Sequence, residues 1–334
     1  MEKAKWEIDV AVLLIFFCRD KQFNQVFEQV KKARPKTLLL YQDGARDGRA
    51  TDIEGIKKCR AIAENIDWEC DVYTYYQEKN VGCDPSEFIA QKWAFSIVDK
   101  CIILEDDDVP SQSFFRFCKE LLDYYENDTR INMICGMNNN DVTEDIEDSY
   151  LFTTKGSIWG WASWKRVIDK WDDTYAILDD SSALKRMEEN FDSKSSFNKY
   201  IKNCSDHRMS GRAHYESINS LCMFSDSTLN IVPKYNMISN VGVGGETTHG
   251  GDDIRKYPKK IRNLLFKKTY EIEFPLKHPK YVMRNRDFER KMTLSYTERM
   301  LCKVESAFLH LKYGGISELK KMLKQVLAGF VKGM

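Results

Sequence analysis

Residues 100–108 read KCIILEDDD, an apolar run that passes directly into four consecutive carboxylates, Glu105 to Asp108. The apolar run predicts a buried strand over 100–104. Adjacent carboxylates raise each other's pKa unless a cation neutralises them, and hard oxygen ligands suit Mg²⁺ or Mn²⁺. The alternative is an acidic helix start, because Val109-Pro110-Ser111 follows and carboxylates favour helix N-termini. The position at a strand end favours the metal and, through it, a diphosphate.

The residues before this stretch alternate between strand and helix patterns. Apolar runs predict strands over 10–17, 37–41 and 70–76, and apolar residues at helical spacing predict helices over 21–32, 51–65 and 86–98. Repeated βα units of this size predict an α/β fold with an open, doubly wound sheet, whose ligand lies at the carboxyl ends of the strands. After an expected helix over 114–126 the alternation weakens, with short strands predicted over 132–135, 150–153, 229–232 and 237–239.

Six blocks, taken in chain order, carry a resemblance to a known family. They are 12–19 (VLLIFFCR), 41–44 (YQDG), 80–82 (NVG), 104–108 (LEDDD), 157–164 (SIWGWASW) and 230–249 (NIVPKYNMISNVGVGGETTH). In this combination the chain resembles the GT-A glycosyltransferases, and more narrowly their N-acetylglucosaminyltransferase I-like and bacterial family 2-like branches. The resemblance covers roughly residues 8–250. It implies a Rossmann-like, mostly parallel central sheet flanked by helices.

The resemblance also implies a reaction, the metal-dependent transfer of a sugar from a nucleotide-diphosphate donor to a hydroxyl of a glycan or glycolipid. Since members of this family commonly use UDP-sugars, the expected donor is a UDP-sugar. A divalent cation, Mn²⁺ or Mg²⁺, would neutralise the leaving diphosphate. Asp107 aligns with the usual metal ligand and His249 is a candidate second ligand, with Asp106 or Asp108 as substitutes for Asp107. The residues implied to contact the nucleotide or donor are Arg19, Asp43, Asn80, Gly82, Glu105 and Asp106.

The general base is expected at Glu216, which aligns with the aspartate of a W-D-x-x-W segment in inverting relatives. Tyr215 and Asn219 replace the two tryptophans, so the acceptor pocket should differ from theirs. As base, Glu216 would support a single displacement with inversion at the anomeric carbon. A surface glutamate on a helix is the alternative interpretation, and Asp172 and Asp173 are the reserve candidates for the base.

Sugar and acceptor contacts are expected from two glycine-containing segments. Trp159 and Trp161 flank Gly160, and two residues apart on an extended segment they would face one side as a platform for a sugar ring. Core packing is the alternative for both indoles. Gly244 and Gly245 would allow positive φ and close approach of backbone N–H groups to phosphate oxygens.

The formal net charge is zero, with 51 basic and 51 acidic side chains, but the charges are segregated. From Ile254 onward there are 20 Lys and Arg against 7 Asp and Glu, a surplus of 13 positive charges. Residues 1–253 therefore carry a matching surplus of 13 negative charges. We therefore expect a catalytic domain over 1–253, with a nucleotide-binding half over 1–110 and an acceptor half over 111–253, and a basic, mainly helical extension over 254–334. Because the basic surplus lies apart from the expected site, nucleic acid is not the expected partner.

The extension contains a candidate membrane contact. Apolar residues recur at helical spacing from Ile316 to Val331 with lysines elsewhere on the wheel, a pattern typical of a helix lying on anionic lipid. The alternative is a helix packed on the catalytic domain with its lysines in solvent.

The cysteines and the apolar runs indicate where in the cell the protein is expected. The ten cysteines are scattered without metal spacing, and the apolar run over 10–17 is too short to span a bilayer, so we expect a cytoplasmic protein, with peripheral contact at the inner face of the membrane. The competing functions are a sugar-nucleotide pyrophosphorylase and a non-catalytic carbohydrate-binding protein. The pyrophosphorylase is disfavoured because Phe17-Cys18-Arg19-Asp20 lacks the glycines of its first loop.

Overall fold

The computed structural model describes residues 3–243 and 253–331. Its centre is an eight-stranded sheet in the order β3-β2-β1-β4-β8-β6-β9-β7. The strands are β1 (Ile8–Phe16), β2 (Pro35–Gln42), β3 (Asp71–Tyr76), β4 (Lys100–Glu105), β6 (Ile131–Cys135), β7 (Tyr150–Thr153), β8 (Trp161–Trp164) and β9 (Leu229–Pro233). The first four pair in parallel, which confirms the expected α/β class with a mostly parallel central sheet.

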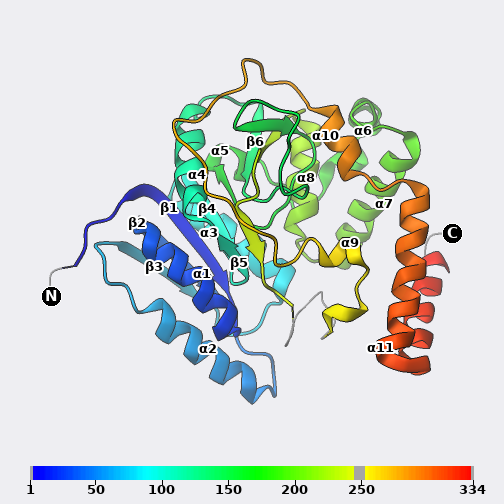
Figure 1. Cartoon of the computed structure of the whole chain (residues 1–334), viewed down its shortest axis with the longest axis horizontal. Coiled ribbons are helices and arrows are strands. Elements are labelled where there is room, and N and C mark those ends of the chain that lie inside the picture. The colour runs from blue at the N-terminus through cyan, green and yellow to red at the C-terminus, as the bar shows by residue number, and fades with distance from the viewer. Residues whose placement is uncertain (1–2, 244–252, 332–334) are drawn as a thin grey trace.

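The helices divide between the two faces of the sheet in the way right-handed crossovers require. Helices α1 (Asp20–Ala33) and α2 (Ala50–Ala63) follow β1 and β2 and lie on one face of the first three strands (Figure 1). Helix α3 (Cys83–Ile97) leads back across β2 and β1 to β4 and contacts the other face, together with α5 (Lys165–Ile168) and α8 (Tyr215–Ser225). Helix α4 (Gln112–Tyr124) packs on β1, β4, β6 and β8.

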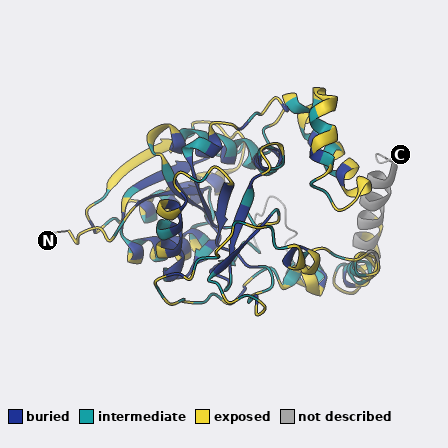
Figure 2. Cartoon of the chain, turned by 90° about the horizontal axis from the view of Figure 1, so that it is seen from above, coloured by how far each residue is buried: buried dark blue, intermediate teal, exposed yellow. Residues whose placement is uncertain are grey.

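The parallel strands form because their residues are apolar on both faces. Along β1, every residue from Val10 to Phe16 is buried, and β4 is buried from Cys101 to Leu104. Helix α1 supplies one cover for them through Phe23, Val26 and Phe27 at helical spacing. Figure 2 shows the buried residues gathered in the sheet, with exposed residues on the outer sides of the helices.

A second, two-stranded sheet stands beside the end of β4. Its strands are β5 (Asp108–Pro110) and β10 (Ile238–Asn240), which pair antiparallel with Asn240 opposite Asp108. This pairing brings the segment at 238–240 against the carboxylates that end β4. The remaining elements between 165 and 225 are helical: the 3-10 turn at Ala176–Asp179, α6 (Ser181–Glu188) and α7 (Lys194–Ser210).

The basic extension begins as a strap across the body. The backbone N–H of Phe266 donates to Asn240, that of Tyr270 to Asn236, and that of Asn285 to Phe152 in β7. The Glu271 carboxylate accepts from the N–H groups of Gln112 and Ser113 at the start of α4, at 3.0 and 2.6 Å. The boundary expected at 253 stays a prediction, but residues 264–289 pack on the acidic body.

Four helical pieces complete the extension. They are the 3-10 turn at Ile254–Lys256, α9 (Lys259–Arg262), α10 (Arg286–Met292) and the long α11 (Tyr296–Val331), which kinks at Gly315. Helix α11 lies beyond α9, on the side away from β1–β3 (Figure 1). Lys260 pairs with Glu298 of α11 at 2.7 Å. Within the described residues, no helix has both the length and the apolar character needed to cross a membrane.

Candidate functional site

The order of the sheet places one crevice at the ends of β1 and β4. From β1 the chain adds β2 and β3 on one side and β4 on the other, so the loops after β1 and β4 diverge and leave a cavity between them. This strand-end cavity has a volume of about 360 Å³. All six residues expected to contact the nucleotide or donor line it: Arg19, Asp43, Asn80, Gly82, Glu105 and Asp106.

Arg19 connects the loop after β1 with the carboxylates after β4. Its guanidinium forms a two-pronged ion pair with Asp106, and its Nη1 lies 2.8 Å from Oδ2 of Asp107. The N–H of Phe17 also donates to Asp106, at 3.3 Å. Burial favours the neutral guanidine, but Asp106 and Asp107 outweigh it and raise the pKa of Arg19. The cavity therefore holds a permanent positive charge beside two carboxylates.

Asp43 ties the loop after β2 to the loop before α3. One carboxylate oxygen accepts from the N–H groups of Gly44 and Val81, at 2.8 and 3.0 Å. The other accepts from the N–H of Gly82 at 3.0 Å and from the Asn80 amide at 2.8 Å. Burial nevertheless raises the pKa of Asp43 above its ordinary value. Asp43 thus builds the wall of the cavity, and its direct contact with a nucleotide base stays a prediction.

The last two carboxylates of the acidic run have different surroundings. Asp108 is fully buried and accepts from the N–H of Gly160 at 2.8 Å and from the Asn240 amide at 3.1 Å. Asp107 accepts from the same amide at 3.1 Å and pairs with Arg19. Burial and repulsion from Asp106 outweigh the attraction of Arg19 and raise the pKa of Asp107 to about 6. Both carboxylate oxygens of Asp108 thus have protein donors, and its role as a substitute metal ligand stays a prediction.

Asn240 is a site residue that the sequence pattern did not single out. Its side-chain amide spans Asp107 and Asp108, and its Oδ1 accepts from the N–H of Gly242 at 3.0 Å. The N–H of Val241 donates to the Asp107 carbonyl at 2.9 Å. Its only sequence signal is its place in the block 230–249, in which the expected ligand contacts are Gly244, Gly245 and His249. His249, Gly244 and Gly245 lie outside the described residues.

The donor set allows a test of whether a divalent cation fits. Asp106 and Asp107 are the hard oxygen donors that Mg²⁺ and Mn²⁺ prefer, and the raised pKa of Asp107 reflects the repulsion that a cation relieves. Within residues 3–243 and 253–331, however, no three His, Cys, Asp or Glu side chains stand together as a metal cage. Arg19 holds the position between the two carboxylates. A cation therefore fits Asp106 and Asp107 only if Arg19 turns toward a ligand.

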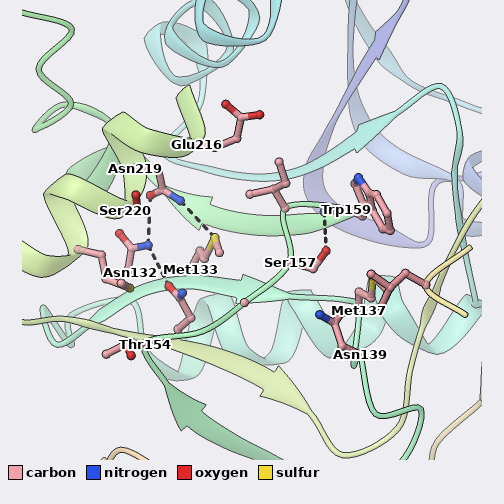
Figure 3. A pocket seen from close by; sticks show the side chains of 15 residues that line it. Asn132, Met133, Met137, Asn139, Thr154, Ser157, Trp159, Glu216, Asn219 and Ser220 are labelled. Carbon is pink, nitrogen blue, oxygen red and sulfur yellow. Dashed lines mark hydrogen bonds between the residues drawn. The ribbon is translucent and has the colours of Figure 1, made fainter. Parts of the chain in front are cut away.

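A second cavity, of about 420 Å³, opens between β6, α8 and the loop before β8 (Figure 3). We call it the amide cavity, since Asn132, Asn139, Asn219 and Asn230 all line it. Glu216, the expected base, lines it from the first turn of α8. The neighbouring Tyr215 reaches the other way, its hydroxyl 3.5 Å from Oε1 of Glu105. The first turn of α8 therefore contacts the walls of both cavities.

The reserve candidates for the base lie elsewhere. Asp172 lines neither cavity, and its carboxylate accepts from Thr174 and from the N–H of Ala176 within its own turn. Although burial opposes ionisation, these hydrogen bonds lower the pKa of Asp172. Asp173 is exposed and also lines neither cavity.

The expectation that Trp159 and Trp161 form one platform is wrong. Trp159 lines the amide cavity, whereas Trp161 is 1% exposed and packs its ring against those of Trp171 and Tyr215. The intervening Gly160 has φ +60°, which breaks the extended alternation that would put both indoles on one side. Gly160 also lacks room for a side chain, because a Cβ there would overlap Ile238. Trp161 is a core residue.

Glu87 of α3 is a second functional candidate that the sequence did not indicate. It lines the strand-end cavity, is almost fully buried, and accepts from the Cys83 thiol at 3.4 Å. Burial, with repulsion from Glu216, raises the pKa of Glu87 well above its ordinary value. Burial, with repulsion from Glu87, also raises the pKa of Glu105 well above its ordinary value. A glutamate inside a helix carries no sequence signal of this kind.

Comparisons with known proteins leave the family open. No protein-family model matches the chain, and no curated protein matches it. Among solved structures, a UDP-glucose pyrophosphorylase complexed with UDP-glucose is 9% identical with a TM-score of 0.34, over 69% of this chain and 92% of that one.

Two further structures are similar at the same level. An inositol-1-phosphate CTP transferase from T. maritima is 9% identical with a TM-score of 0.36, over 78% and 96% of the two chains. A 4-diphosphocytidyl-2C-methyl-D-erythritol synthase from Anaerococcus prevotii is 9% identical with a TM-score of 0.28, over 58% and 84%. At these TM-scores the likeness carries no argument about activity, which must come from the geometry.

Proposed function

We propose that this chain is a glycosyltransferase that moves a sugar from a nucleotide-diphosphate sugar, by family habit a UDP-sugar, to an acceptor hydroxyl. One observation supports the proposal above the others: the first turn of α8 touches the walls of both cavities, because the Tyr215 hydroxyl contacts Glu105 of the strand-end cavity and Glu216 lines the amide cavity. A transferase with two substrates needs two adjoining subsites and a proton acceptor between them.

The strand-end cavity is the proposed donor subsite. It lies at the carboxyl ends of parallel strands, at the point where the order of the sheet reverses. Arg19 supplies a cation for the diphosphate, and a planar guanidinium binds phosphate oxygens in pairs. The hydrogen bonds from Asn80 and Gly82 to Asp43 hold the loop before α3 in place as one wall of the cavity.

The amide cavity is the proposed acceptor subsite, with Glu216 as the base. Glu216 would take the proton from the acceptor hydroxyl while the acceptor oxygen bonds to the anomeric carbon. The bond from that carbon to the diphosphate oxygen breaks in the same displacement, so the configuration inverts and the diphosphate leaves with the negative charge. Arg19 would face that charge in the strand-end cavity.

A divalent cation is also part of the proposal, on the condition that Arg19 turns toward the bound ligand. Asp107 and Asp106 would hold Mn²⁺ or Mg²⁺, with His249 as a further candidate outside the described residues. The cation would neutralise the leaving diphosphate. Asp106 and Asp107 keep their places through Phe17, Asn240 and the β5–β10 pairing.

The experiment compares products and a matched pair of variants. Incubation with a panel of nucleotide sugars, Mn²⁺ or Mg²⁺ and saccharide acceptors should release nucleoside diphosphate in step with a new glycosidic bond. Glu216→Gln should slow transfer by about 10²–10⁴-fold, the usual contribution of a general base, and leave donor affinity within about twofold. The control Asp173→Asn should keep full activity, because Asp173 lies outside both cavities.

Two other outcomes point to the competing functions. Release of pyrophosphate from a nucleoside triphosphate and a sugar 1-phosphate, without glycoside formation, would make the chain a sugar-nucleotide pyrophosphorylase. Saccharide binding with no turnover of any nucleotide sugar would make it a carbohydrate-binding protein.

We propose anionic lipid as the partner of the extension. On α11, Leu309 is packed inward, while Leu301, Val304, Phe308 and Leu311 are exposed and recur three or four residues apart, with Met300 exposed beside Leu301. An apolar stripe on the outward face of a helix is unusual for a surface in water alone. The surplus of 13 positive charges after residue 253 complements an anionic membrane surface. The lysines and apolar residues from Ile316 to Val331, named from the sequence, belong to the second helical piece of α11, after the break at Gly315.

A further inference from the structure

The strand-end cavity has two sides, which the order of the sheet separates. Arg19 follows β1 and pairs with the carboxylates that follow β4, so the cation proposed for the diphosphate lies over β1 and β4. On the other side, Tyr41 of β2, Asp43 just after it and Ser86 in the first turn of α3 line the cavity. A nucleoside whose diphosphate lies at Arg19 would therefore extend toward β2 and α3, where the rest of the cavity lies.

The hydroxyl of Ser86 is a buried polar group without a partner. Ser86 is 4% exposed, and its backbone N–H donates to the Gly82 carbonyl at 3.0 Å, which fixes the residue at the start of α3. Its Oγ atom, however, forms no hydrogen bond with any residue in 3–243 or 253–331. Since buried polar atoms are almost always hydrogen-bonded, an orphaned hydroxyl in the wall of a cavity indicates a ligand that would complete it.

The polar neighbours of Ser86 are occupied with other partners. Asp43 accepts its four hydrogen bonds from the two loops that it joins, and a carboxylate offers about four acceptor positions. The Tyr41 hydroxyl accepts from the Gln77 amide at 3.0 Å. Burial raises the pKa of Asp43 and of Tyr41, and the nearby Ser86 hydroxyl offsets part of that rise. No hydrogen bond of normal geometry joins Ser86 Oγ to either side chain, so the hydroxyl is available to a ligand.

The same cavity contains a stacking surface for a planar ring. Phe17 lines it, and the Arg46 guanidinium lies over the Phe17 ring, 5.5 Å from its centroid. Arg46 is held there by the fully buried Asp52, which accepts from its Nε and Nη2 at 2.7 Å each. Nucleobases stack well on aromatic rings and on guanidinium planes. A base stacked in this cavity would present its polar edge to a hydroxyl in the wall.

We infer that the Ser86 hydroxyl hydrogen-bonds the nucleobase of the donor and so determines which nucleotide binds most tightly. The inference rests on the proposed function and adds to it the residue that reads the base. A hydroxyl both donates and accepts, and therefore matches a carbonyl oxygen, a ring nitrogen or an amino group on the edge of a base. The diphosphate that Arg19 would face is the same in every nucleoside diphosphate. Ser86 thus affects the choice among bases, whereas Arg19 affects the affinity for all of them.

The test measures binding of UDP, CDP, ADP and GDP to the full chain by calorimetry, with competition titrations for the weaker ligands. Ser86→Ala should weaken the tightest of the four by about three- to tenfold, the usual value of one hydrogen bond. It should change the other three less than twofold, so that the discrimination narrows. Unchanged affinity for the tightest nucleotide overturns the inference. An equal loss for all four also overturns it, because the hydroxyl would then contact the ribose or the phosphates, and so does equal affinity of the wild type for all four.

Melting temperatures separate a ligand contact from a structural role of the hydroxyl. Because Ser86 Oγ has no partner among the described residues, Ser86→Ala should melt at the same temperature as the wild type, or higher, without nucleotide. The upward shift produced by the tightest nucleotide should be smaller in the variant. A lower melting temperature without nucleotide, together with an undiminished shift, overturns the inference.

Two further variants complete the test. Ser86→Cys keeps the approximate size of the side chain but has a weaker donor, and should reproduce the narrowed discrimination. The matched control is Ser96→Ala on the same helix, where the exposed hydroxyl donates to the Trp93 carbonyl. This control should leave the affinities for all four nucleotides unchanged. Failure of the wild-type chain to bind any nucleoside diphosphate contradicts the proposed function instead.

Discussion

Replacement of Arg19 by methionine would leave Asp106 and Asp107 without their counter-charge. Both carboxylates are nearly buried, at 3% and 7% exposure, and each has an ion pair with Arg19. Methionine keeps an unbranched, flexible stem and removes the guanidinium with its charge and donors. The variant therefore tests chiefly the electrostatic role of Arg19.

The structure sets the expected size of the effect. Removing one partner of a buried ion pair costs about 3–5 kcal/mol, and the partial exposure of Arg19 places this case near 3 kcal/mol. At about 2 °C per kcal/mol, expected for a chain of this size, the melting temperature should fall by about 6 °C.

The loss of stability in Arg19→Met depends on pH through the ionisation of Asp107. In the wild type, burial already raises the pKa of Asp107 to about 6. Without Arg19 the pKa of Asp107 rises further, because the attraction that opposed burial is gone. A carboxyl whose pKa is raised on folding stabilises the folded state at low pH and loses that contribution as pH increases. The deficit of Arg19→Met should therefore be largest at pH 8 and shrink toward pH 5.

The assay is thermal and urea denaturation at both pH values, with nucleotide binding measured in parallel. The control Arg212→Met removes an exposed arginine and should leave stability unchanged. The double variant Arg19→Met with Asp107→Asn should recover much of the stability but not the affinity for UDP. Millimolar Mn²⁺ should stabilise Arg19→Met more than the double variant, since a cation can replace the lost guanidinium at Asp106 and Asp107.

The reasoning is refuted if Arg19→Met is as stable as the wild type at pH 8, or if its deficit is larger at pH 5. Equal stabilisation of the single and double variants by Mn²⁺ would contradict the assignment of Asp107 as a metal ligand.

Three further predictions concern other parts of the molecule. Glu87→Gln should raise the melting temperature at pH 8 more than at pH 5, because burial and Glu216 raise the pKa of Glu87 and its ionisation costs stability as pH rises; an equal change at both pH values would contradict this. Glu289→Gln should cost about 2 kcal/mol at pH 7 by urea denaturation, because the buried Glu289 carboxylate accepts from Thr153, Thr154 and Arg284. Burial opposes ionisation of Glu289, but these donors outweigh burial and lower its pKa. The stability that the Glu289 carboxylate contributes is therefore lost as pH falls below 4.5. A stability deficit of Glu289→Gln that persists undiminished at pH 3 would contradict this prediction. Leu301→Ser with Phe308→Ser should reduce flotation with anionic vesicles at least fivefold without lowering the melting temperature, and undiminished flotation would remove lipid as the partner of α11.

Local patterns in the sequence were sufficient to predict the elements of residues 1–110. The strands β1, β2 and β4 are continuous apolar runs and α1 has apolar residues at helical spacing, so their positions follow from burial on both faces or on one. The carboxylates after β4 were recognisable because charge seldom follows such a run directly. The loops that carry Arg19 and Asp43 could be placed at the same edge for the same reason.

The rest depended on contacts between residues far apart in the chain. Asn240 meets Asp107 and Asp108, which lie 133 and 132 residues earlier in the chain, because β10 pairs with β5, and short strands leave almost no sequence pattern. The separation of Trp159 from Trp161 depends on the positive φ of Gly160, which a period-two argument cannot anticipate.

The acidic run at 105–108 marks the division between the two kinds of information. The sequence by itself determined that four carboxylates end a buried strand at the edge of a parallel sheet, since strand burial is a local property of apolar residues. Only the tertiary structure decided that Asp108 binds Gly160 and Asn240, that Asp106 and Asp107 face Arg19, and that Glu105 faces Tyr215. The physical reason is that the charge state and role of a carboxylate depend on burial and on partners within a few ångströms, and those partners come from distant segments.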